Sequence, residues 1–195
     1  MLAAQLHAGR ITTMATPIVD ANYRFIAAYN EVNARVTQRQ QALTLYVSLI
    51  VSLLAALVAL RPSSGAAPAP VEWLILGFPV ASICFALLNY KAERAITNLR
   101  TFLSVLEKLG GASESLPSYN TDPMWSRNAN KARCFHDYAV ALLVAGGNML
   151  GLGAAQAIYP QRFVETPAFM AVAVGLGVCA VVVVLLTPRW SYVPD

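Results

Sequence analysis

The stretch YAVALLVAGGNMLGLGAAQAIYPQ, residues 138–161, contains 24 residues and no charged side chain. A helix needs about 20 apolar residues to cross the roughly 30 Å hydrocarbon layer of a membrane, so this stretch is long enough to span one. Its centre, AGGNMLGLG at residues 145–153, holds four glycines and one asparagine. Such residues at membrane depth indicate a packed scaffold, a pore or a ligand site, and the rest of the sequence bears on which.

Three further runs without charge cover residues 40–60, 73–90 and 166–188, and they are 21, 18 and 23 residues long. Hydrophobic residues make up 57% of the chain and charged residues only 12%. A soluble domain carries about 25% charged residues. We therefore predict an all-α integral membrane protein with four transmembrane helices, for which the lipid bilayer is the first partner.

The basic residues are distributed unevenly between the two sides of such a protein. Of the 14 Lys and Arg residues, only Arg61 and Arg162 lie on one side, which leaves twelve on the other. Cytoplasmic loops carry the excess of Lys and Arg, so we expect a multi-pass protein of the bacterial inner membrane with both termini in the cytoplasm. This asymmetry also accounts for the net charge of +4, and no nucleic-acid partner is predicted.

Residues 17–109 are expected to form one unit, in which an amphipathic helix, the first two spans and their helical extensions make a cytoplasmic hairpin. Helical spacing of apolar residues continues outside both spans, at steps of three and four. This stripe is predicted to close the hairpin or to bind a cytoplasmic protein. Its members are Phe25, Tyr29, Val32, Val36, Ile96, Leu99 and Leu103.

The remaining segments complete the predicted organisation. Residues 1–16 are expected to be a disordered tail, and the sequence leaves open whether the chain starts at Met1 or Met14. Residues 110–137 are polar, contain Pro117 and Pro123, and are predicted to be an irregular cytoplasmic loop that serves as a linker or as a partner contact. Residues 138–195 hold the third and fourth spans and a short tail.

The glycines of the last two spans are predicted to be helix-packing positions. In lipid, close approach of two helices depends on small residues at their contact, and the third span offers several of them. The predicted packing positions are Gly147, Gly151, Gly153 and Gly175. A hinge or a pore lining remains the alternative for the same residues.

The polar side chains predicted to lie deepest in the first and third spans are Asn148, Gln156, Ser48 and Ser52. A polar group at membrane depth has to find a hydrogen-bond partner or water. These residues are therefore predicted either to bond between helices or to line a hydrated path through an oligomer. No charged residue lies deep in any span, which disfavours a proton-coupled transporter.

No constellation of residues indicates catalysis, a cofactor site or a metal site. Arg133, Cys134, His136 and Asp137 are the one dense cluster, but a single Cys and a single His supply too few ligands for a metal. We interpret this cluster as a charged collar at the mouth of the third span. The protein is accordingly predicted to be no enzyme and to need no cofactor.

The first two spans and their flanks resemble a known family. The residues that carry the likeness are AAYNEVNARVTQRQQALTLYVSLIVSLL at 27–54 and LILGFPVASICFALLNYKAERAITNLRTFLSVLEKL at 74–109. They are similar to the SLATT-type two-helix membrane effectors of bacterial conflict systems, over about residues 20–109. The resemblance implies a pore that forms when a defence signal arrives. This chain adds a second pair of spans, so the signal would come from a separate protein.

These observations lead to two functional hypotheses. The first is a non-enzymatic, homo-oligomeric membrane effector or channel-like protein, pore-forming in bacterial antiviral defence in response to a cytoplasmic signal or partner. The alternative is a membrane-anchoring scaffold that recruits a cytoplasmic protein and conducts nothing.

The predicted topology can be measured with reporters. A reporter fused after Asp195 or inserted near Ser115 should read as cytoplasmic, and one inserted near Gly65 as external, because twelve basic residues lie on the first side and two on the second. Alkaline phosphatase and green fluorescent protein fusions give complementary signals. A cytoplasmic signal at Gly65 would overturn the arrangement.

Overall fold

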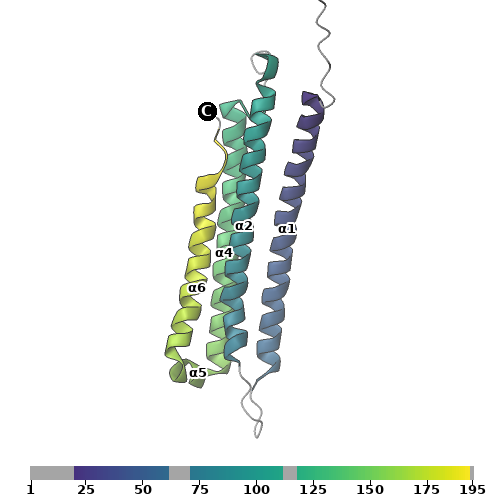
Figure 1. The fold of residues 1–195 in the computed structure, drawn as a ribbon. Helices are drawn as coiled ribbons and strands as arrows, with labels where there is room; N and C mark the ends of the chain where they lie inside the picture. The colour runs from purple at the N-terminus through teal and green to yellow at the C-terminus, as the bar shows by residue number, and fades with distance from the viewer. Residues whose placement is uncertain (1–19, 62–70, 112–117, 194–195) are drawn as a thin grey trace, which may run out of the picture.

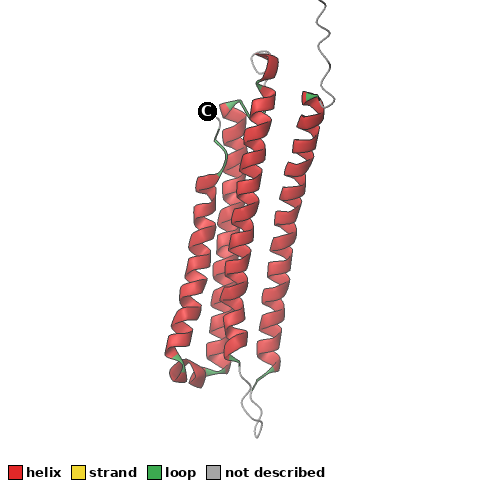
Figure 2. Cartoon of the chain, in the orientation of Figure 1, coloured by secondary structure: helices red, strands yellow, loops and turns green. Residues whose placement is uncertain are grey.

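The computed structural model describes residues 20–61, 71–111 and 118–193, and every regular element in these ranges is a helix (Figure 2). The predicted tail, residues 1–16, lies outside the described residues. The four long helices are α1 (Ala21–Ala59), α2 (Glu72–Glu107), α4 (Pro123–Ile158) and α6 (Pro167–Leu186). The short elements are α5 (Pro160–Glu165) and the 3₁₀ turns η1 (Leu109–Gly111) and η2 (Thr187–Trp190).

Each long helix includes most of one of the charge-free runs. All four are long and apolar enough to cross a membrane, α6 together with η2. The prediction of an all-helical chain with four such helices is thus confirmed for the described residues, and the structure is compatible with a multi-pass membrane protein.

The helices form an elongated bundle in which α2 and α4 lie between α1 and α6 (Figure 1). α1, α2 and α4 contain 39, 36 and 36 residues, which corresponds to about 55–60 Å at 1.5 Å per residue. That is nearly twice the hydrocarbon thickness of a membrane. All three helices continue beyond their charge-free runs at the same end of the bundle. We call this three-helix region, residues 21–39, 91–107 and 123–137, the extension.

The start of α4 corrects one prediction. Residues 123–137 were expected to be irregular, but they form the first turns of α4. The carboxylate of Asp122 accepts hydrogen bonds from the backbone N–H groups of Met124 and Trp125, at 2.7 and 3.4 Å, and Pro123 occupies the first helical position. An N-cap aspartate followed by proline is a strong helix start, so Pro123 opens a helix rather than a loop.

Two of the four predicted packing glycines contact a neighbouring helix. A Cβ atom on Gly151 would come within 2.5 Å of the Phe78 ring, and one on Gly147 would lie 3.0 Å from the Tyr46 hydroxyl. These two glycines therefore permit the close contact of α4 with α2 and α1. Nothing lies within 4 Å of the equivalent position on Gly153 or Gly175, so neither glycine makes such a contact within the described chain.

The packing role of Gly151 can be tested against Gly153 on the same helix. Gly151→Ala should lower stability by about 1–3 kcal/mol, because the added methyl group must displace the buried Phe78 ring. Gly153→Ala should leave stability unchanged or slightly higher, since alanine favours a helix and has free space there. Thermal unfolding of the detergent-solubilised protein measures both. Equal midpoints for the two variants would contradict the contact.

Candidate functional site

The Asn148 side chain is buried and forms hydrogen bonds within the chain. The Asn148 amide donates to the Ser82 hydroxyl at 2.7 Å and to the Val144 carbonyl at 2.8 Å. The Ser82 hydroxyl also shares a hydrogen bond of 3.0 Å with Tyr46. Tyr46, Ser82 and Asn148 thus connect α1, α2 and α4 through a buried polar chain, in the manner of interhelical hydrogen bonding.

The other predicted pore positions lie elsewhere on the bundle. Ser48, Ser52 and Gln156 are exposed on its outer surface, and the Ser52 hydroxyl donates to the Ser48 carbonyl on its own helix at 2.8 Å. The four polar residues therefore do not face one another. Within the described chain they do not line a common path.

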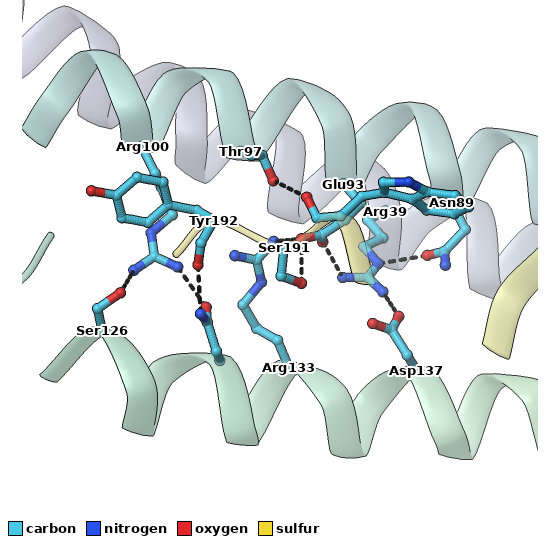
Figure 3. Close-up of polar contacts among 12 residues, drawn as sticks. Arg39, Asn89, Glu93, Thr97, Arg100, Ser126, Arg133, Asp137, Ser191 and Tyr192 are labelled. Atoms are coloured by element: carbon cyan, nitrogen blue, oxygen red, sulfur yellow. Dashed lines mark hydrogen bonds and ion pairs between the residues drawn. The ribbon is translucent and has the colours of Figure 1, made fainter. Parts of the chain in front are cut away.

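A buried ion cluster lies where the extension meets the charge-free runs (Figure 3). Its centre is Arg39 of α1, which is 8% exposed, while Glu93 of α2 and Asp137 of α4 are 0% and 1% exposed. Arg39 donates from Nε to Asn89 Oδ1 at 2.6 Å, from Nη1 to Glu93 Oε2 at 3.4 Å, and from Nη2 to the Asp137 carboxylate. A single arginine thus joins three helices.

Two further contacts complete this ion cluster. Arg133 of α4 donates from Nη2 to Glu93 Oε1, and the Ser191 hydroxyl donates to the same oxygen at 3.0 Å. Arg39, Arg133, Glu93 and Asp137 carry two positive and two negative charges, so the cluster is neutral as a whole. Buried charges persist only when paired and hydrogen-bonded in this way.

Arg100, further out along α2, makes contacts of a different kind. It is 5% exposed and donates to Asn120 Oδ1 at 3.2 Å, to Asn130 Oδ1 at 3.0 Å and to the Ser126 hydroxyl at 3.3 Å. The guanidinium also lies 4.9 Å from the centre of the Tyr192 ring. All of these partners are neutral, in contrast to those of Arg39.

The segment after α6 is held across the extension by the same residues. Tyr192 accepts a hydrogen bond at its carbonyl from Asn130 at 2.5 Å and donates from its hydroxyl to the Asn120 carbonyl at 3.0 Å. The Thr97 hydroxyl donates to the Trp190 carbonyl at 3.0 Å. The end of the chain therefore ties α2 to α4 on the side of the bundle where α6 lies (Figure 1).

Between α1 on one side and α2 and α4 on the other, the extension contains a cleft of ≈ 790 Å³. Its lining residues follow steps of three and four, so each helix contributes one face. The lining comprises Phe25, Tyr29, Val32, Asn33, Val36, Arg39 and Gln40 of α1, Ile96, Arg100, Leu103 and Glu107 of α2, Tyr119 and Asn120, and Ala129, Ala132, Arg133 and His136 of α4.

This cleft contains most of the apolar stripe that the sequence singled out. Six of its seven residues line the cleft: Phe25, Tyr29, Val32, Val36, Ile96 and Leu103. Leu99 is half-buried on α2 and lies outside the lining. Tyr29 and Val36 remain 53% and 42% exposed, so the α1 wall is incompletely covered by the rest of the described chain.

The charged collar predicted around residue 135 is split between two features. Arg133 and Asp137 belong to the ion cluster, His136 lines the cleft, and Cys134 is half-buried. Among the described residues there is no group of three or more side chains that could hold a metal ion. No pattern in the sequence pairs Arg39 with Glu93 or Asp137. The available signal was that all three flank charge-free runs at the same end of the bundle.

Comparison of the chain with protein-family models, with curated proteins and with solved structures gives no match. The interpretation of the cleft and of the ion cluster depends on their own residues and geometry.

The ion cluster can be tested with two arginines of the same helix. Arg39→Ala should destabilise the protein by about 3–5 kcal/mol, because Glu93 and Asp137 stay buried with one cation fewer. Arg35→Ala should cost less than about 1 kcal/mol, since Arg35 and its partner Glu31 are 36% and 44% exposed. Denaturant unfolding in mild detergent measures the difference. Similar losses of unfolding free energy in both variants would mean that the buried ion cluster stabilises the protein no more than an exposed ion pair does.

Proposed function

We propose that this protein is a non-enzymatic, membrane-anchored binding protein. Its four apolar helices cross the membrane, and the extension holds the cleft at the cytoplasmic surface, where the basic loops are expected. The observation that carries the proposal is the cleft itself, ≈ 790 Å³ between three helices. Ligand sites in proteins are concave, mostly apolar and about 300–1,000 Å³ in volume, with a few polar groups.

The chemistry of the cleft favours binding over catalysis. Its walls are aliphatic and aromatic, and its polar members are arginines, amides, Glu107 and His136. Arg39 and Arg133 are paired with buried carboxylates, and both oxygens of Glu107 accept hydrogen bonds from Asn120. Groups engaged in this way fix the shape and charge of a site.

The second candidate is the oligomeric, pore-forming effector. One observation favours it: Ser48, Ser52 and Gln156 place polar groups on the outer surface of the bundle within the charge-free runs. Such a pore would run between copies of the chain, because Asn148 is bonded to Ser82 inside the bundle. In that role the cleft would receive the signal, and the binding function would be shared by both candidates.

Native mass spectrometry of the purified protein tests the binding function without knowledge of the ligand. Ala132→Trp should remove a co-purifying ligand mass, because Ala132 lines the cleft and an indole would occupy it. Ala34→Trp is the matched control, since Ala34 is an exposed alanine of the extension outside the cleft. Identical ligand masses in both variants would count against the cleft as the binding site.

Leakage from vesicles separates the two candidates. An anchored binding protein should leave dye-loaded vesicles as tight as protein-free ones, with and without the co-purified ligand. A pore should release dye when the ligand is present, and the release should fall when Gln156, at the outer surface, is replaced by Leu.

A further inference from the structure

Arg100 is a buried cation without a carboxylate in direct contact. Its three nitrogens donate to Asn120, Asn130 and Ser126, and no salt bridge to it occurs among the described residues. A guanidinium has five N–H groups, so about two of them have no partner in these contacts. Arg100 is connected to a carboxylate only indirectly, because its partner Asn120 donates from its amide to Glu107 at 2.7 Å.

A second arginine lines the same cleft. Arg133 is bonded to Glu93 through Nη2, but its Nη1 is buried and has no hydrogen-bond partner among the described residues. Both Arg100 and Arg133 line the cleft, and Figure 3 shows their side chains between α2 and α4. Buried donors of this kind are costly unless an acceptor reaches them, and an anionic acceptor is the strongest that can do so.

The α1 wall of the cleft is largely apolar towards the start of the helix. Phe25, Tyr29, Val32 and Val36 present one face of α1, with Ile96 and Leu103 across from them. The cleft thus combines a long hydrocarbon-like wall with donors that belong to two arginines. A ligand that matches both features has an apolar chain and one anionic group.

The dimensions of the cleft are those of a small-ligand site. From Phe25 to Gln40 the lining extends over 15 residue steps of α1, or about 22 Å. Its volume of ≈ 790 Å³ lies within the range of small-molecule sites.

We propose that the cleft binds a single-chain amphipathic anion, with its carboxylate or phosphate on Arg100 and Arg133 and its chain along the α1 wall. The proposal rests on the proposed binding function and names its ligand class. The anion accepts hydrogen bonds from the free N–H groups, and the chain covers the exposed surface of Tyr29 and Val36.

Photo-crosslinking with palmitate that carries a diazirine tests this proposal in phosphatidylcholine nanodiscs. We expect crosslinks in residues 25–36 and 129–136, outside the charge-free runs where bilayer lipid would react. Arg100→Gln should reduce this labelling about tenfold or more, as for loss of a charged hydrogen bond, while Arg94→Gln, exposed on the same helix, should not. Excess palmitate or lysophosphatidate as competitor identifies the preferred head group.

A second variant and an uncharged probe separate ligand binding from a folding defect. Ala132→Trp should abolish labelling while Arg100 stays in place, so a folding defect of Arg100→Gln does not decide the outcome. Hexadecanol with the same diazirine should label only the spans. Equal labelling of the cleft by hexadecanol, or crosslinks confined to the spans, overturns the proposal. If Ala132→Trp nevertheless removes a co-purifying mass, the binding function stands and only the ligand class is wrong.

Discussion

The pairing of Arg39 with Glu93 and Asp137 is the constraint on which the arrangement of the helices depends. All three side chains are less than one-tenth exposed, and a buried ion without a partner costs several kcal/mol. The cluster therefore fixes the register of α1, α2 and α4 at one level of the bundle. Ser191 brings the end of the chain to the same level through Glu93. An apolar helix surface alone tolerates sliding and rotation, whereas this set of paired charges is satisfied in one arrangement.

The packing of the helices differs between the two parts of the bundle that lie on either side of the ion cluster. On one side the helices are in close contact, with Gly151 against Phe78 and Asn148 bonded to Ser82. On the other side α1 is separated from α2 and α4 by the cleft, so the ion cluster closes the inner end of the cleft. The four charges of the cluster balance one another, whereas Arg100 donates only to neutral partners. Arg39 and Arg100 thus differ in the kind of partner that each one binds.

The sequence was sufficient to predict the helices, but it was not sufficient to predict the contacts between them. Runs without charge predicted four apolar helices, because the length of such a run is a local property. The steps of three and four that singled out Phe25, Tyr29 and Val32 placed them on one face, which the structure directs into the cleft. The start of α4 at Pro123 was missed, since proline opens helices as well as ending them. Arg39 and Asp137 are 98 residues apart, and no local pattern indicates that they pair. Gly153 and Gly175 show the same limit: a small residue permits a contact, but only the helix orientation decides whether one forms.

The distance between α1 and α4 across the cleft tests most directly whether the ion cluster holds the extension together. Spin labels at Ala27 and Asn128, both exposed and outside the cleft lining, report this distance by pulsed electron paramagnetic resonance after the three native cysteines are replaced. We expect one narrow distance distribution in the parent protein and in Arg35→Ala, and a broad one in Arg39→Ala. An unchanged narrow distribution in Arg39→Ala would contradict this expectation.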